Sequence, residues 1–556
     1  MKTIKKITFL SILSLSLAGC DLDTKPYQSI DVDQLTPGNV ETLTLGTYAY
    51  MKSNNGIMRS AHYFGEYGSD NLALSGSTTD PLMNIYNYLR TTNNSRIADI
   101  WSYSYKTIIN INATLEVAPE GESKEFDMII GENYYLRAFH YFTLVNVFGQ
   151  PYINNPETNL GVPIKLTTSL DDFPERATVK EVYEQIEKDL LKAIELMTIP
   201  EGSTIQPKNS CYASKEVAEA LLSRVYLYME NWEKVLEYTN NVINSGRYSL
   251  LEGDAYKSYP TFVPEENSET IFAVRYTKDV DYLPDYRPYM IGSMYAEIDN
   301  DGWGEMYPSD SYLRLLDLHP EDLRQTFIHK QTLDNGNYWF IYTSKNNTYV
   351  KVPVSKKGDS YTIIDPTGYQ SAMVTKESYH GGTAYTVTAV DGTKYYGRVE
   401  EEMDTRNDYP KYYIYKCSLQ EGQAQLWSPI VSRLAEMYLN RAEAKFHLND
   451  LQGALDDVNI IRDRAGIPEW TLTNLPEGMS VLDVTLEERR MELAFEAQRR
   501  FDIYRNRLNL NRNYPGGHIS SGGPTTVKYN EAAIVEYIPQ SEMLAYPNQG
   551  VLVQNP

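Results

Sequence analysis

Apolar residues recur at three- and four-residue spacing through much of the first half of the chain and again near its end, which predicts a mainly α-helical protein. Helices are expected over residues 40–51, 97–117 and 132–148. The third, ENYYLRAFHYFTLVNVF, is apolar nearly all round and should be a buried helix, stopped by Gly149 and Pro151. Thr178 with Glu181 three residues later forms a capping box that opens a further helix.

Two pairs of predicted helices resemble each other in layout. Residues 213–230 are followed by 232–245, and residues 428–448 are followed by 451–464, with Pro429 placed at the start of the second pair. When the two pairs are aligned, residues Asn231 to Val235 correspond to Asp450 to Ala454. Each stretch is a short turn followed by a small or apolar residue. This layout is that of tetratricopeptide units, whose paired helices bury their faces by stacking.

The middle of the chain, residues 254–425, follows a different pattern. Alternating or β-branched runs occur at 271–276, 348–354, 360–364, 383–390 and 394–399. Val390-Asp391-Gly392-Thr393 is a strong hairpin turn. The predicted fold class is therefore mainly α, a tetratricopeptide-like scaffold of helical hairpins carrying a loop-rich, partly β insertion.

The N-terminus has the features of a secreted lipoprotein. Lysines precede an apolar run from about residue 7 to 17, which ends in Leu17-Ala18-Gly19-Cys20. The run is shorter than the roughly 20 residues that cross a bilayer, and it is typical of a cleaved signal. We predict a signal peptide over 1–19, a lipidated N-terminus at Cys20 and an extended tether over 20–36.

Composition narrows the range of partners. The formal charge is −23, and loss of the three signal lysines lowers it by three, to −26, which disfavours nucleic acid. The chain holds 47 Tyr against 6 Trp and 14 Phe. Tyrosine combines a flat apolar face with a hydroxyl, which suits sugars. Cys211 and Cys417 could form one disulfide or remain buried free thiols, and both alternatives stay open.

Motifs for catalysis or cofactor binding are absent from the sequence. It contains no nucleophile elbow, HExxH zinc motif, phosphate-binding glycine loop or dinucleotide fingerprint. Asp299-Asn300-Asp301-Gly302 begins like a calcium loop, but Pro308 stands where the loop needs Glu. Abundant carboxylates leave a glycosidase-like acid pair open as an enzyme alternative. We predict a protein that is not an enzyme and has no cofactor or metal.

Residues 485–505, TLEERRMELAFEAQRRFDIYR, which we call the signature segment, predict one amphipathic helix. Thr485 and Glu488 form its expected capping box, and we interpret Glu496, Arg499 and Arg500 as structural. The segment resembles the signature ERR-x-ELAFE-x-x-R-x-FD-x-x-R of the SusD/RagB family, surface lipoproteins that capture glycans for uptake. RAFHYFTLVNVFGQPY (137–152), the RLAE…AEA block at 433–444 and IPQSE…PN near the end resemble further family blocks.

The resemblance covers essentially the whole mature chain and implies its organisation. It implies an N-terminal helical part over 37–253, the insertion over 254–425 and a C-terminal helical part over 426–556. It further implies lipid anchoring on the outside of the outer membrane and delivery of a captured glycan to a SusC-like TonB-dependent transporter. Capture of peptides by the same scaffold remains the alternative.

Two loop regions, 70–94 and 282–303, combine aromatics with planar polar side chains, as sugar recognition requires. The resemblance implies that ligand aromatics come from these two parts of the chain, brought together at the surface. Trp101 is assigned to the core because of its helical spacing. The candidate ligand-binding residues are Asp70, Asn84, Tyr86, Asn87, Tyr88, Arg90, Tyr282, Tyr286, Tyr289 and Trp303.

Overall fold

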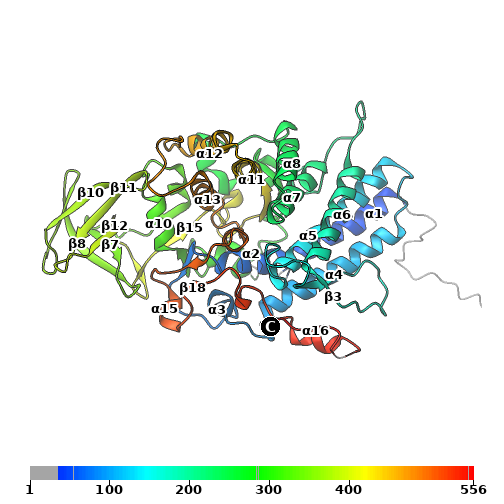
Figure 1. The fold of residues 1–556 in the computed structure, drawn as a ribbon, viewed down its shortest axis with the longest axis horizontal. Helices are drawn as coiled ribbons and strands as arrows, with labels where there is room; N and C mark the ends of the chain where they lie inside the picture. Colours follow the sequence, from blue (N-terminus) through cyan, green and yellow to red (C-terminus); the bar gives the residue numbers. More distant parts are fainter. Residues whose placement is uncertain (1–35, 54–55, 284, 286, 549) are drawn as a thin grey trace, which may run out of the picture.

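The computed structural model describes residues 36–53, 56–283, 285, 287–548 and 550–556. The predicted signal peptide, Cys20, the predicted tether up to residue 35 and Tyr286 lie outside these residues. Figure 1 shows a helical body with a strand-rich module at its left end, so the predicted fold class is confirmed. None of the helices in these ranges is both long and apolar enough to cross a membrane.

Six helices build the N-terminal part of the helical body, and α1, α4, α5 and α6 lie on the right of Figure 1. Helix α5 packs between α4 and α6, and nearly all its side chains from Phe126 onward are buried, as its apolar run predicts. The Thr178–Glu181 capping box is present at the start of α6. The helices are α1 (Pro37–Met51), α2 (Ile57–Tyr67), α3 (Leu82–Tyr86), α4 (Ser95–Val117), α5 (Lys124–Phe148) and α6 (Val179–Met197).

Two stacked helical hairpins follow, as predicted. Helix α7 (Lys215–Tyr228) pairs with α8 (Trp232–Asn244), α11 (Leu434–His447) pairs with α12 (Leu451–Ala465), and α11 also packs on α8. Gly466 ends α12 at φ +77°, the left-handed position that favours glycine. The predicted helix start at Pro429 is wrong. Residues Ile430–Arg433 form strand β16 instead, because they pair with β4 (Thr270–Ala273).

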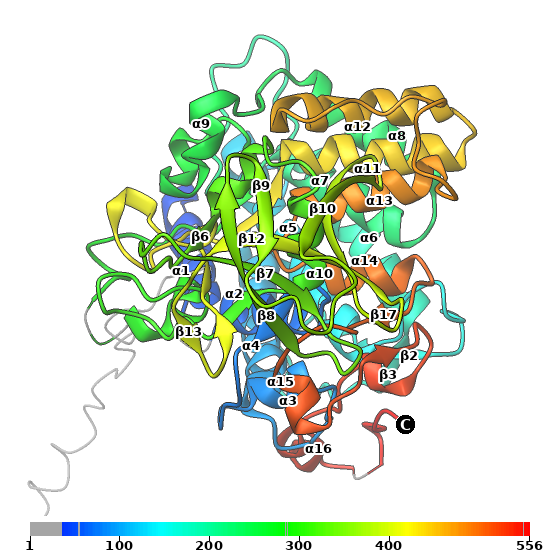
Figure 2. The same ribbon diagram turned by 90° about the vertical axis from the view of Figure 1, so that its left-hand side faces the viewer.

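The strand-rich module is a closed six-stranded antiparallel barrel, seen face-on in Figure 2. Its interior is filled by apolar and tyrosine side chains, including Phe340, Val354 and Val387. The predicted turn at 390–393 joins β11 to β12, with Gly392 at φ +84°. The strands are β7 (Tyr338–Thr343), β8 (Tyr349–Lys357), β9 (Ser360–Ile363), β10 (Met373–Tyr379), β11 (Gly382–Thr388) and β12 (Lys394–Glu401).

Short two-stranded ladders tie distant parts of the chain together. The chain enters and leaves the barrel module through one such ladder, β6 with β15. The pairs are β1 (Leu72–Leu74) with β5 (Met306–Pro308), β2 (Leu160–Pro163) with β3 (Arg176–Thr178), β6 (Ile328–Lys330) with β15 (Tyr412–Ile414), β13 (Thr405–Arg406) with β14 (Tyr409–Pro410) and β17 (Leu510–Asn511) with β18 (Thr526–Val527). The remaining short helices are α9 (Gly253–Lys257), α10 (Asp310–Leu316), α15 (Gly517–Ser521) and α16 (Gln540–Ala545).

The signature segment is two helices rather than the predicted one. Helix α13 (Val481–Glu492) starts earlier than predicted, with Ser480 and Asp483 as its capping box, so the predicted cap at Thr485 is wrong. Helix α14 (Arg499–Arg505) follows a break at which Phe495 and Ala497 adopt positive φ. Packing against α2 stabilises the break, since the Ala497 amide donates to the Glu66 carboxylate at 2.9 Å. Periodicity alone carries no signal for such a tertiary contact.

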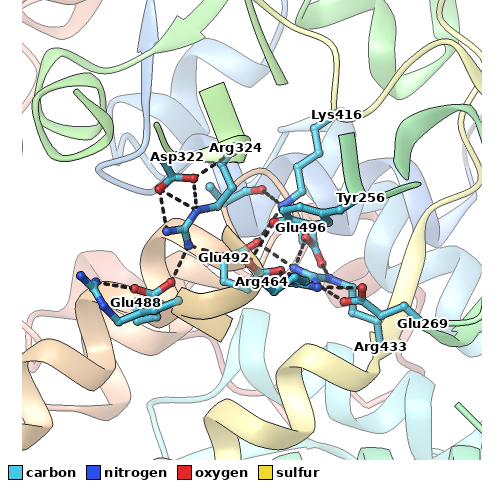
Figure 3. Close-up of polar contacts among 12 residues, drawn as sticks. Tyr256, Glu269, Asp322, Arg324, Lys416, Arg433, Arg464, Glu488, Glu492 and Glu496 are labelled. Atoms are coloured by element: carbon cyan, nitrogen blue, oxygen red, sulfur yellow. Dashed lines mark hydrogen bonds and ion pairs between the residues drawn. The ribbon is translucent and has the colours of Figure 1, made fainter. Parts of the chain in front are cut away.

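Three carboxylates of the signature segment, Glu488, Glu492 and Glu496, lie in a buried ion-pair network, drawn in Figure 3. Arg433 contacts Glu269, Glu492 and Glu496, and Arg464 contacts Glu269 and Glu492, all between 2.5 and 2.8 Å. Burial alone would raise the pKa of Glu492, but Arg464 and Arg433 hold it well below its usual range. The acidic and basic side chains therefore interlock in the core, and the structural interpretation of Glu496 is confirmed.

The two cysteines of the described chain are unpaired. Cys211 and Cys417 are both buried and free, which leaves the free-thiol alternative. Burial raises the pKa of the Cys211 thiol to about 12. Neither thiol is poised as a nucleophile, because the reactive form is the thiolate.

Candidate functional site

Asp70 lies in the interior, beneath the signature segment. Its carboxylate accepts from Arg499 at 2.7 and 2.9 Å, and Arg490 lies 3.7 Å away. Burial would raise the pKa of Asp70, but the Arg490 and Arg499 guanidinium groups hold it well below its usual range. Asp70 is thus an internal counter-ion for the signature segment, with no free oxygen facing solvent.

Tyr86 and Tyr88 are also interior residues. The Tyr86 hydroxyl contacts His518 Nδ1 at 2.9 Å, and the Arg512 guanidinium lies 4.0 Å from its ring centre. Tyr88 is held at φ +56°, and its hydroxyl accepts from Tyr504 at 2.7 Å. Because both rings are buried, the expectation that they stack on a ligand does not fit their environment.

The other first-region candidates are partly or fully covered. Asn87 is buried and donates to the Ser521 hydroxyl at 3.0 Å. Asn84 is half-buried, and the Arg90 guanidinium lies 4.3 Å from the Tyr537 ring centre. Most candidate side chains of this region are therefore covered by protein and do not face solvent.

The second region supplies the exposed aromatics. Trp303 is 55% exposed and Tyr289 is 47% exposed, the highest values among the described candidate residues. Tyr282 is buried, with its hydroxyl donating to the Ala424 carbonyl at 3.1 Å and the Arg287 guanidinium 4.6 Å from its ring centre. Tyr289 lies in the short turn η4 (Arg287–Tyr289), and Trp303 donates its amide to the Ser293 carbonyl in η5 (Ile291–Met294) at 2.7 Å. Tyr289 and Trp303 thus flank η5 within one loop region, and we call these two exposed residues the aromatic platform.

The two predicted regions meet at the edge of the aromatic platform. Strand β1 of the first region pairs with β5, which comes directly after the second region, and the Ser75 amide donates to the Glu305 carbonyl at 2.9 Å. The Asn407 side chain donates to the Ser75 carbonyl at 2.7 Å, and Arg406 donates to the Trp303 carbonyl. The structure therefore brings the regions together through their backbones, while the exposed aromatic side chains come from the second.

Arg406 and Asn407 were missed by sequence reasoning. Arg406 ends β13, and Asn407 begins the turn to β14, in which Asn407 and Asp408 have φ values of +50° and +67°. The adjacent Asn and Asp are a turn signal, because these residues tolerate the left-handed region. Their position beside Trp303 comes only from the tertiary fold.

The aromatic platform is open rather than enclosed. Beside Tyr289 the surface is hollowed by only about 10 Å³, room for no more than about one water molecule. An open ring face suits stacking on the C–H face of a sugar within a longer chain. The part of the chain that the structure describes holds no group of three or more His, Cys, Asp or Glu side chains able to bind a metal.

Comparison with known proteins relates the chain to proteins described as SusD-like. A family model described as "Starch-binding associating with outer membrane" matches residues 22–227. SusD-like protein P2 of Formosa agariphila is 26% identical over 531 residues, with 90% of both chains covered. SusD-like protein P38 of the same organism is 24% identical over 538 residues, covering 91% of this chain and 92% of that protein.

Solved structures share the fold. A SusD superfamily protein of Bacteroides thetaiotaomicron matches with a TM-score of 0.69 at 23% identity, covering 94% of this chain and 100% of that one. A SusD-like carbohydrate binding protein of Bacteroides vulgatus matches with a TM-score of 0.62 at 19% identity, covering 93% and 97%. The model of the SusD family itself matches residues 268–556, more than half of the chain, so the resemblance of the signature segment is confirmed and this protein belongs to the SusD family.

Proposed function

We propose that the protein is a non-enzymatic, cell-surface glycan-binding lipoprotein, which captures oligosaccharide or polysaccharide at the aromatic platform. The observation that carries the proposal is the exposure of Trp303 and Tyr289 on either side of η5. Exposed aromatic faces of this kind are what sugar stacking uses. The description of the family model and of the Bacteroides vulgatus structural neighbour support a carbohydrate as the ligand.

The setting of the proposed function is the outer membrane. The lipobox ending at Cys20 supports attachment through an N-terminal lipid, and the family model supports association with the outer membrane. We infer that the protein covers a SusC-like TonB-dependent transporter and passes the captured glycan to it. The acidic surface, with a formal charge of −23 for the full chain, favours neutral ligands over polyanions.

Affinity electrophoresis tests the proposal. Protein from Asp21 onward is run through gels that contain different neutral polysaccharides, together with Trp303→Ala and Tyr289→Ala variants. Phe173→Ala is the matched control, because Phe173 is 40% exposed but lies in the loop between β2 and β3, which pack on α5 and α6. We expect at least one polysaccharide to retard the unaltered protein and the control variant. Both platform variants should lose this retardation.

Other outcomes would redirect the proposal. Binding of a peptide digest, with no retardation by any polysaccharide, would favour the peptide alternative. Shortening of the polysaccharide during the run would show catalysis and contradict the non-enzymatic assignment. Retardation that survives both platform variants would place the glycan site elsewhere on the surface.

A further inference from the structure

A cavity of about 550 Å³ lies where the barrel meets the helical body. Figures 1 and 2 show the barrel placed against α10, and the cavity is lined by α10, the loop after it, β11, β12 and the exposed side of α13. Its volume falls within the roughly 300–1,000 Å³ typical of small-ligand sites. It is separate from the aromatic platform, since none of its lining residues belongs to the two predicted loop regions.

One wall of the cavity is aromatic. The rings of Tyr379 and Tyr396 lie 4.4 Å apart at an interplanar angle of 34°. Tyr379 is 44% exposed and Tyr396 is half-buried, so the pair is only partly covered by protein. Tyr396, Arg398 and Glu400 alternate along β12, which places them on the same face of the strand, toward the helical body.

Much of the remaining cavity lining is polar, and its charges are already paired. Lys330 lies 2.9 Å from Glu400, His380 lies 3.0 Å from Glu487, and Arg398 is bound by Asp310. An anionic or cationic ligand would have to break one of these pairs, which is costly where they are buried. A neutral ligand with hydroxyl groups can instead add hydrogen bonds to the paired carboxylates and guanidinium groups.

Two polar atoms of the cavity wall, Arg398 Nε and Asp317 Oδ2, lie 3.6 Å apart as an ion pair, and neither has a hydrogen-bond partner. The Asp317 side chain is nevertheless 23% exposed. A sugar hydroxyl in the cavity can therefore donate to its carboxylate. Arg314, 41% exposed with Asp310 as its ion-pair partner at 3.3 Å, offers further N–H donors.

The walls are held in fixed positions. At the turn between β10 and β11, a Cβ on Gly381 would lie 2.1 Å from the Trp470 ring, so the turn packs directly on the helical body. The Thr383 amide donates to the Leu318 carbonyl at 3.1 Å on the same side. A site whose walls do not move on binding loses less conformational entropy.

We propose that this cavity is a second saccharide-binding site, which takes one or two neutral sugar units against Tyr379 and Tyr396. The ligand class rests on the proposed function, whereas the location rests on the cavity alone. Arg314, Asp317 and Glu487 supply the groups that bind the sugar hydroxyls. The barrel would then hold one part of a glycan while the aromatic platform holds another.

Saturation-transfer difference NMR on protein from Asp21 onward tests the proposal, with maltose, cellobiose and lactose as probes. We expect signal from at least one disaccharide with the unaltered protein. Tyr379→Ala should weaken that binding about tenfold, as expected for loss of an aromatic contact with its buried area. Tyr50→Ala, which removes an equally exposed ring on α1, should leave the signal unchanged.

A second variant distinguishes loss of the binding site from loss of folding. Ala384→Phe would fill the cavity from β11 without removing any binding group, and it should abolish the signal while the urea unfolding midpoint stays near that of the unaltered protein. Disaccharide signal that survives both Tyr379→Ala and Ala384→Phe would overturn the proposal, as would no signal from any probe.

The Trp303→Ala variant separates the two proposals. Both sites are supported if Trp303→Ala abolishes retardation by polysaccharide but keeps the disaccharide signal, and if Tyr379→Ala removes that signal. Signal lost only with Trp303→Ala would leave the aromatic platform alone and refute the cavity site. Signal lost only with Tyr379→Ala, with no effect of Trp303→Ala on retardation, would keep the cavity and refute the platform.

Discussion

Residues 70–94 and 282–303 are alike in composition, yet the structure places them in opposite environments. Tyr86 and Tyr88 of the first region are buried, whereas Tyr289 and Trp303 of the second are about half exposed. The difference comes from what covers each region. Arginines from the signature segment and the residues after it lie over the first region and pair with its carboxylate and rings: Arg490, Arg499, Arg500 and Arg512.

The comparison teaches that aromatic and polar residues mark a ligand surface only where the fold leaves them exposed. A tyrosine ring and an aspartate suit arginine as well as they suit a sugar, and Tyr289 stays 47% exposed although the Arg59 guanidinium lies 5.1 Å from its ring centre. The following substitutions compare buried positions with exposed ones.

The largest effect is expected for Asp70→Ala. It would leave Arg490 and Arg499 buried without their counter-ion, which costs about 3–5 kcal/mol of unfolding free energy. Asp285→Ala, at an exposed position in the second region, should stay within about 0.5 kcal/mol. Urea unfolding followed by circular dichroism measures both. Equal effects would mean that the first region is not the more deeply integrated one.

Tyr86→Ala should destabilise by about 3 kcal/mol, because it empties a buried site and removes the ring that Arg512 covers. Its counterpart Tyr289→Ala removes a half-exposed ring and should cost less than about 1 kcal/mol. Thermal unfolding by calorimetry compares the two. A larger loss for Tyr289→Ala would contradict the assignment of Tyr289 to a solvent-facing platform.

The interior beneath the break in the signature segment should also respond to pH. Burial raises the pKa of Glu66 to about 7, so its contribution to stability is fully present below the ordinary pKa near 4.5 and is lost as pH rises through 7. From pH 5 to 8 the unaltered protein should therefore lose about 1–3 kcal/mol relative to Glu66→Gln. Urea unfolding of both proteins at several pH values measures the difference. Parallel pH profiles would show that Glu66 does not titrate in this range.

Trp303→Ala should have the smallest effect on stability, within about 0.5 kcal/mol, since its ring is mostly in solvent. Trp101→Ala is the counterpart, because Trp101 is buried edge-to-face against Phe148 at 4.9 Å and its loss should cost about 3–5 kcal/mol. Differential scanning calorimetry reports both. A strongly destabilised Trp303→Ala would show that this ring packs on the scaffold.

Local rules predicted much of the scaffold. The Thr178–Glu181 capping box, the buried α5 and the hairpin turn at Gly392 follow from short-range chemistry, and the structure has all three. The core assignment of Trp101, made from helical spacing, is also confirmed.

What the sequence could not show depends on contacts between distant residues. The break after α13 is stabilised by Glu66, more than four hundred residues earlier in the chain. Closure of the barrel requires β7 to pair with β12, and burial of Tyr86 requires Arg512. Each of these contacts joins segments whose own patterns are unremarkable.

The ladder of β6 with β15 has a consequence for how such a protein can diversify. Ile328 and Ile414 are direct partners in that ladder, so the chain departs for the barrel and returns one strand spacing away, about 5 Å. An inserted segment whose two ends are adjacent can be lengthened, shortened or replaced at little cost in chain entropy. Closing a longer loop adds only about 0.6 kcal/mol for each doubling of its length. The barrel can therefore change in sequence and length as a unit, and present new surfaces, while the structure of the helical body stays the same.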